Sequence, residues 1–212
     1  MTAVIRQLPG LSDYQQTLER MRQFTRERSA QTPDEIWLLE HPPVFTLGLA
    51  GRSGHLLNPD PIEVVKTERG GQVTYHGPGQ VIAYTLIDLR RLGIGVKELV
   101  FRIEQALIQT LATWQIDARR ISGAPGVYVP FSGGHGQFEG FAKIAALGIK
   151  ISGGCSFHGA ALNVAMDLEP FTRIDPCGYP GLRTIDMATL GVHAPLPEVE
   201  QTLAQRLAAH LG

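Results

Sequence analysis

The chain has 212 residues, of which 43% are hydrophobic and 18% are charged, and its formal net charge is −1. That length suits one domain with its own core, so we expect residues 1–212 to form a single domain. The composition excludes a disordered chain, and the near-neutral charge gives no reason to expect nucleic acid or an anionic membrane as a partner. The sequence shows no apolar run long enough to span a bilayer and no signal-peptide pattern, which predicts a cytoplasmic protein.

The first half of the chain predicts one helix followed by short strands. Apolar residues at helical spacing, with Ser12 and Gln15 placed as in a capping box, predict a helix over Ser12–Ser29. Apolar runs between turn residues then predict strands at Ile36–Glu40, Val44–Leu47, Ile62–Lys66 and Gln80–Asp88. Between these strands we expect a surface loop at Ala50–Pro61 and a glycine-rich turn at Arg69–His76 that leads into a short β segment.

The second half predicts two more helices around a further set of strands. One apolar face from Val96 to Trp114 predicts a helix over Gly95–Trp114, and Pro197 suits the first turn of a last helix. The β segments are expected at Val127–Pro130, Phe141–Leu147, Ile149–Ser152 and Ala160–Met166, with a glycine-rich loop at Phe131–Gly140. This order lacks the regular alternation of strand and helix of a doubly wound fold, so it indicates an α+β domain.

Cys177 is the candidate nucleophile. It lies between Pro176 and Gly178, a corner that can present a thiol, although an isolated cysteine is more often a small buried apolar residue. Asp175 would disfavour the thiolate, so a reactive Cys177 needs a cation from elsewhere in the chain. Cys155 is expected to be structural, and both thiols are expected to be reduced.

Lys143 is the candidate cation. In the segment Phe141–Leu147, strict alternation puts Phe141, Lys143, Ala145 and Leu147 on one face of a strand. If that face is buried, the ammonium must pair with an anion or lose its charge. The alternative is an edge position from which the ammonium reaches water along its own stem.

The stretch RGGQVTYHGPGQ, residues 69–80, combines glycines with Arg69 and His76. It contains no GxxxxGK[ST] motif, and Gly77 and Gly79 are followed by Ile82 where a dinucleotide motif needs glycine, so the nucleotide motifs fail. We expect a glycine-lined wall against which an extended ligand can lie. A purely structural cluster of turns is the alternative.

Two histidines in His-Gly turns, His76 and His158, are candidate bases for Cys177, and a loop-orienting role is the alternative for each. Cys155 and His158 have the spacing of metal ligands, but no second pair completes a site. We therefore expect no metal.

Four motifs together carry a family resemblance. RGGQVTYHGPGQ, FAKIAALGIKI, FHGAALNV and DPCG occur in this order between Ile36 and Thr189, and together they resemble the lipoyl(octanoyl) transferases. The resemblance implies a mixed β-sheet packed with helices, like the catalytic domain of biotin and lipoate protein ligases.

The resemblance also implies the activity and the site. An octanoyl group would pass from octanoyl-acyl carrier protein to a lysine of a lipoyl domain, through an acyl-thioester on Cys177, and Lys143 would lower the pKa of that thiol. The implied substrate-binding residues are Arg69, Gly70, Gly71, Gln72, Val73, Thr74, Tyr75, His76, Ala146, Leu147, Gly148, Gly159, Ala160 and Ala161.

The implied acceptors are the lipoyl domains of 2-oxoacid dehydrogenase complexes and the glycine-cleavage H protein. No cofactor is implied, and we expect a monomer. Because acyl carrier proteins are acidic, a basic patch is expected, for which Arg119 and Arg120 are candidates. Two other classes remain: an ATP-dependent lipoate or biotin ligase of the same fold, and a protein that binds acyl carriers or lipoyl domains without turnover.

Overall fold

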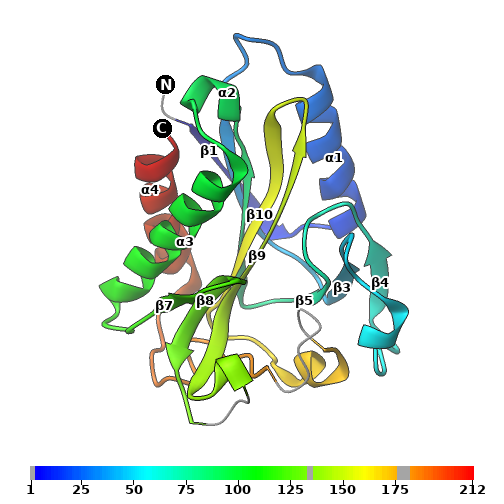
Figure 1. Ribbon diagram of the computed structural model, residues 1–212, viewed down its shortest axis with the longest axis vertical. Coiled ribbons are helices and arrows are strands. Elements are labelled where there is room, and N and C mark those ends of the chain that lie inside the picture. Colours follow the sequence, from blue (N-terminus) through cyan, green and yellow to red (C-terminus); the bar gives the residue numbers. More distant parts are fainter. Residues whose placement is uncertain (1–2, 133–135, 176–181) are drawn as a thin grey trace.

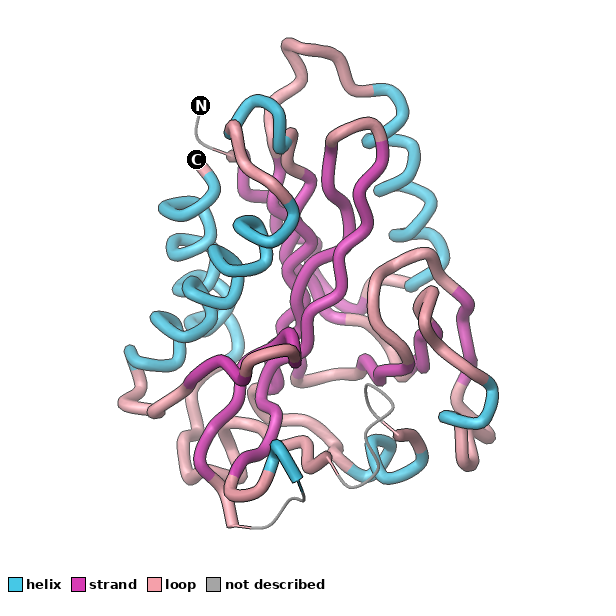
Figure 2. The backbone as a smooth tube through the Cα atoms, viewed as in Figure 1, coloured by secondary structure: helices cyan, strands magenta, loops and turns pink. Residues whose placement is uncertain are grey.

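The computed structural model describes residues 3–132, 136–175 and 182–212, and it places a central layer of strands between helices (Figure 1, Figure 2). Seven strands form the main sheet in the order β1-β2-β6-β10-β9-β8-β7. In that order, their bounds are Val4–Leu11, Glu35–Glu40, Gln80–Leu86, Cys155–Asn163, Phe141–Ser152, Ala124–Pro130 and Arg119–Ile121. β1 runs parallel to β2 and the other neighbours are antiparallel, so the sheet is mixed as predicted.

A smaller sheet lies to one side of the main sheet and carries the glycine-rich turn. Its three strands are β4 Glu63–Lys66, β3 Val44–Leu47 and β5 Val73–His76, with β3 in the middle. β3 pairs in parallel with β4 and antiparallel with β5. Short 3-10 helices occur at Ser53–His55, Gly136–Phe138 and Glu169–Arg173.

Helices cover both faces of the main sheet (Figure 1). α1, Tyr14–Glu27, packs on one face, while α3, Val96–Thr113, and α4, Leu196–Leu211, pack together on the other, with the short α2, Leu89–Leu92, near the sheet end. Each long helix buries one apolar stripe, as the helical spacing in the sequence predicts. The buried stripes include Leu18 and Met21 of α1, Leu99, Ile103 and Leu107 of α3, and Leu203 and Leu207 of α4.

The sequence missed two strands and misplaced the boundaries of others. β1 and β7 were not predicted, and β1 is exposed along most of its length, so it lacks a buried apolar pattern. β9 is one continuous strand over the two expected segments, and β10 begins five residues before Ala160. α1 is capped by Asp13 and not by Ser12: the Asp13 carboxylate accepts the backbone N–H of Gln16 at 2.8 Å.

The prediction that Phe141, Lys143, Ala145 and Leu147 share one face of β9 was wrong. Val127 and Tyr128 of β8 are consecutive, but their partners are Ala145 and Lys143, so Ile144 is an extra residue in β9. Such a bulge changes the alternation of side chains. Ala145 packs in the core under α3 and α4, whereas Lys143 lies outside that core.

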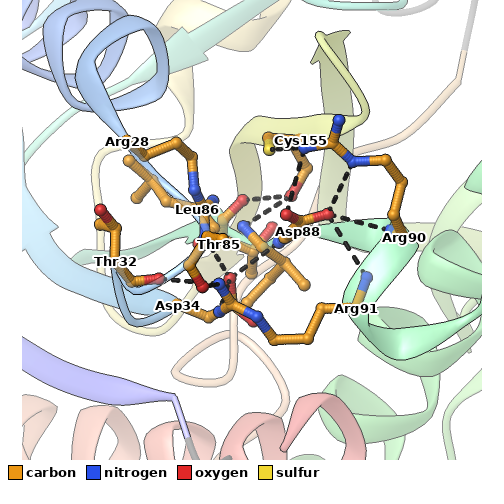
Figure 3. A network of polar contacts seen from close by, with 12 residues as sticks. Arg28, Thr32, Asp34, Thr85, Leu86, Asp88, Arg90, Arg91 and Cys155 are labelled. Carbon is orange, nitrogen blue, oxygen red and sulfur yellow. Dashed lines mark hydrogen bonds and ion pairs between the residues drawn. The ribbon is translucent and has the colours of Figure 1, made fainter.

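A polar network joins the start of β2, the end of β6 and the start of β10 (Figure 3). The buried carboxylate of Asp34 pairs with Arg28 and Arg91 and accepts the backbone N–H of Asp88 at 2.8 Å. Cys155 is a free, buried thiol at this end, and Nη2 of Arg90 lies 3.7 Å from its Sγ. These contacts agree with a structural role for Cys155.

Candidate active site

A groove opens between the main sheet, α1 and the glycine-rich turn. Small residues from neighbouring strands form its floor: Gly159 of β10 is paired with Gly148 of β9, and Ala161 is paired with Ala146. The groove encloses about 740 Å³ including its open mouth, which is within the usual range for small-molecule sites. Its lining exposes far more apolar than polar surface, so it suits an acyl chain. We call it the acyl groove.

Two of the floor glycines are required by the backbone itself. A Cβ on Gly148 would lie 2.8 Å from the carbonyl oxygen of Gly70, and a Cβ on Gly159 would lie 1.9 Å from that of Ala83. Both approaches are too close for a real side chain. These glycines therefore let the turn and the neighbouring strand pack against the floor, and their contribution of space to the groove is secondary.

Arg69 shapes the second wall of the groove. Its buried guanidinium donates to the carbonyl oxygens of Thr46 at 2.6 Å, Gln72 at 2.9 Å and Gly70 at 3.0 Å. It also donates to the hydroxyl of Thr46. Because one cation binds backbone groups from β3 and from its own turn, it fixes the turn against the smaller sheet.

Lys143 lines the acyl groove and is 4% exposed. Its Nζ donates to the carbonyl oxygen of Pro125 at 3.2 Å and lies 5.1 Å from the centroid of the Tyr128 ring. The aromatic face and the carbonyl dipole both favour a positive charge at this position. Gly126 leaves room for the chain, since a Cβ there would lie 3.1 Å from Cε of Lys143.

The backbone of Lys143 is joined to the segment that follows the candidate nucleophile. Its N–H donates to the carbonyl oxygen of Arg183 at 2.8 Å, and its carbonyl accepts from the N–H of Ile185 at 3.0 Å. On the other side, the N–H of Asp175 donates to the carbonyl oxygen of His55 at 3.0 Å. Cys177 itself lies outside the described residues.

A second pocket meets the acyl groove at Lys143. It encloses about 880 Å³ including its mouth, and it lies between α3, the turn before β8, β9 and the glycine-rich turn. Both cavities are lined by Gly71, Gln72, Lys143, Leu147 and Gly148. The Lys143 side chain therefore lies where two separate cavities join.

Two buried histidines, His76 and His158, line the groove, and a third, His41, lies beside His76. Burial lowers the pKa of His76 and of His158 to about 3 and that of His41 to about 4, and the positive charge of Arg69 adds to the lowering at His158. All three are therefore neutral at pH 7. His76 Nδ1 lies 2.8 Å from Oε1 of Gln80.

The described contacts of His76 and His158 fit the loop-orienting alternative. His158 Nε2 lies 3.3 Å from the hydroxyl of Thr67, and the φ of His158 is +61°, so this residue forms an unusual bend inside β10. His158 Nδ1 is buried and has no hydrogen-bond partner among the described residues.

Most of the residues predicted to bind substrate line the acyl groove, but two do not. Gly70 lines only the second pocket, and the ring of Tyr75 packs against Phe45 and Phe171 in the smaller core. The residues in the groove are Arg69, Gly71, Gln72, Val73, Thr74, His76, Ala146, Leu147, Gly148, Gly159, Ala160 and Ala161. The sequence did not point to six further lining residues, which are Tyr14, Ile82, Tyr84, Asn163, Phe171 and Thr184.

Other kinds of site find little support in the described part of the chain. No group of three or more His, Cys, Asp and Glu side chains there could hold a metal ion. Arg119 and Arg120, the candidates for a basic patch, are each paired with a carboxylate, with Asp117 at 2.7 Å and with Glu104 at 2.9 Å. None of the helices within the described ranges has the length and apolar character needed to cross a membrane.

Comparison with known proteins decides the family. Residues 13–208 match the family described as the lipoyl protein ligase A/B catalytic domain. An octanoyltransferase of Polynucleobacter asymbioticus is 58% identical over 212 residues, covering 100% of this chain and 97% of its own length. One from Paraburkholderia phytofirmans is 60% identical over 203 residues, covering 95% of this chain and 84% of its own length.

The chain belongs to the octanoyltransferase family. It is therefore an acyltransferase, and the relatives support octanoyl transfer in protein lipoylation as its activity. The octanoyltransferase fold is shared with ligases at low sequence identity. A bipartite lipoate protein ligase from Thermoplasma acidophilum has a TM-score of 0.79 at 16% identity, covering 100% of this chain and 84% of its own. A biotin protein ligase from Aquifex aeolicus has a TM-score of 0.61 at 12% identity, covering 98% and 70%.

Proposed function

We propose that this octanoyltransferase takes its octanoyl group from octanoyl-acyl carrier protein and passes it to a lysine of a lipoyl domain through a thioester on Cys177. The observation that carries the proposal is the position of Lys143, whose side chain lines an acyl-sized groove. The backbone ladder from Lys143 to Arg183 and Ile185 supports it further, because it brings the chain that follows Cys177 beside this lysine.

The proposed reaction has two balanced steps. The Cys177 thiolate attacks the carbonyl carbon of the donor thioester, the bond to the donor sulfur breaks, and the carrier leaves as a thiol with the proton that Cys177 has lost. The neutral amine of the acceptor lysine then attacks the enzyme thioester, an amide bond forms, and Cys177 leaves as a thiolate that takes up a proton lost by the amine. Lys143 stabilises the thiolate in both steps and helps to move the proton between the reacting groups.

The energetics need no nucleotide. Exchange of one thioester for another is close to balance, and amide formation from a thioester is downhill. Burial of the six internal methylenes of an octanoyl chain contributes about 5 kcal/mol at roughly 0.8 kcal/mol for each CH₂. The proposed acceptors are the lipoyl domains of 2-oxoacid dehydrogenase complexes and the glycine-cleavage H protein. We further propose a cytoplasmic monomer.

Intact-mass analysis after incubation with octanoyl-acyl carrier protein tests the nucleophile. One octanoyl adduct is expected without ATP, and Cys177→Ser should abolish it. Cys155→Ser is the matched control, because it removes the other, buried thiol and should leave the adduct in place. An adduct that persists in Cys177→Ser would refute the assignment.

The same experiment separates the two rival classes. Transfer that requires ATP and Mg²⁺ would favour a ligase, which activates a free acid and has no use for a nucleophilic cysteine. Binding of the acyl carrier without an adduct would favour a non-catalytic protein. Lys143→Ala should slow adduct formation and move its pH profile to higher pH, since the thiolate loses its cation. An unchanged profile would count against the pairing.

A further inference from the structure

The second pocket is separate from the acyl groove, and two of its walls come from parts of the chain that the sequence motifs do not cover. Val96 and Val100 of α3 form one side, and Ala124 and Pro125 at the start of β8 form another. Val96 is 45% exposed, so the pocket opens to solvent at that end. At its inner end it reaches Lys143.

The junction at Lys143 gives the two cavities different roles in one reaction. The carbonyl carbon of a thioester carries two substituents, the acyl chain and the sulfur with everything attached to it. When the acyl chain lies in the acyl groove and the carbonyl lies near Lys143, the sulfur substituent must leave the junction by another path. The second pocket is such a path, since it meets the groove at Lys143 and opens elsewhere.

The chemistry of the walls favours one occupant over another. None of the described residues that line the second pocket is acidic, so these residues offer no carboxylate to an incoming lysine ammonium. Its walls are mainly aliphatic, with glycine backbone at Gly70 and Gly123. The Oε1 atom of Gln72, which lines both cavities, is buried without a hydrogen-bond partner among the described residues, and it can accept an amide N–H.

We propose that the second pocket binds the thiol arm of the acyl donor, a neutral chain of amides and short alkyl segments such as pantetheine. This assignment rests on the proposed function. The arm lies along α3 from the solvent end at Val96 to the junction at Lys143, and Gln72 accepts one of its amide protons. The acceptor lysine then needs only the junction, after the donor thiol has left.

The test compares two small donors, octanoyl-pantetheine and the octanoyl thioester of ethanethiol, which carries no amide. The wild-type enzyme should be acylated by the pantetheine donor at least about tenfold more efficiently, as kcat/KM for adduct formation. Val100→Trp fills the pocket and should bring the two donors to nearly equal efficiency. Val96→Trp, at the exposed end of the pocket, should also reduce the ratio of the two kcat/KM values. Because Val96 is more exposed than the half-buried Val100, the added ring there is less of a risk to folding.

Ala112→Trp is the matched control, because it adds the same ring at an exposed position of α3 that lines neither cavity. It should keep the full preference for octanoyl-pantetheine. A preference that survives in both pocket variants would overturn the assignment. So would a Val100→Trp enzyme that acylates normally but transfers slowly to a lipoyl domain, because the pocket would then serve the acceptor.

The outcome also distinguishes this assignment from the proposed function. If neither donor forms an adduct on the wild-type enzyme, the thioester route fails and this assignment fails with it. If both form the adduct on Cys177 with equal efficiency, the route stands and only the role of the second pocket is refuted.

Discussion

Replacement of Gly126 by alanine should displace Lys143 while leaving every proposed reacting group in the chain. A Cβ at Gly126 would lie 3.1 Å from Cε and 3.3 Å from Nζ of Lys143, and 2.8 Å from the carbonyl oxygen of Ala145. The carbonyl belongs to β9 and cannot give way easily. The lysine side chain is flexible and can move, so we expect Nζ to leave its position beside the carbonyl oxygen of Pro125.

The size of the effect follows from two separate costs. The φ of Gly126 is +129°, so any L-residue there strains the backbone by about 1–3 kcal/mol, which lowers the free energy of unfolding. Movement of a catalytic group by about 1 Å costs on the order of 10²-fold in rate. We therefore expect Gly126→Ala to form the octanoyl adduct about 100-fold more slowly, with the protein still folded.

Gly191→Ala separates the two costs. Gly191 also has a positive φ, +81°, but a Cβ there would have nothing within 4 Å, and Gly191 lines neither cavity. It should lose a similar amount of stability and acylate at nearly the wild-type rate. The assay is the rate of adduct formation, with the pH profile of thiol alkylation alongside and urea unfolding for both variants. Equal acylation rates in the two variants would refute the argument that Gly126 positions Lys143.

Two further predictions concern the groove. The pKa values of His41, His76 and His158 lie far below the ordinary value of 6.5, so between about pH 6.5 and pH 4 the unfolded chain binds protons that the folded chain does not. A fall from pH 7 to pH 5 should thus lower the free energy of unfolding by about 2 kcal/mol for each histidine. Urea titration at the two pH values measures this loss, and a total loss below about 2 kcal/mol would contradict the assignment of three buried neutral rings. In the second prediction, Ala161→Val narrows the groove floor and should raise the preference for hexanoyl over octanoyl donors by at least about tenfold, because the hexanoyl chain is two methylenes shorter and each methylene changes binding by about 1–3 kcal/mol. An unchanged ratio of kcat/KM would show that Ala161 does not touch the chain.

The sequence predicted the elements that have a strong period and missed those that are held by tertiary contacts. The helix expected over Gly95–Trp114 is observed at Val96–Thr113, because one complete apolar face defines it. β1 escaped detection because it lies at the edge of the sheet, is largely exposed and contains Pro9. The face assigned to Lys143 was wrong because a bulge leaves no mark in the alternation of residue types.

The residues of the candidate site likewise include some that the sequence predicted and some that it did not. Motifs pointed to Lys143 and to the glycine-rich turn, and the structure brings both to one groove. Tyr14 and Tyr84 line that groove too, but one belongs to an amphipathic helix and the other to a buried strand, where an aromatic residue is expected to serve the core. The second pocket could not be predicted at all, because Val100 and Pro125 meet only when α3 packs beside β8.

The irregular edge of the main sheet bears on how the protein behaves at high concentration. β1 exposes apolar side chains, with Val4 37%, Ile5 41% and Leu11 53% exposed, and its outer side has no partner strand in the described sheet. A regular edge of this kind would recruit strands from other molecules. Pro9 has no amide proton, and the register of β1 shifts between Gln7 and Leu11. The irregularity around Pro9, which kept β1 from being predicted, should therefore also protect the enzyme against aggregation through this edge.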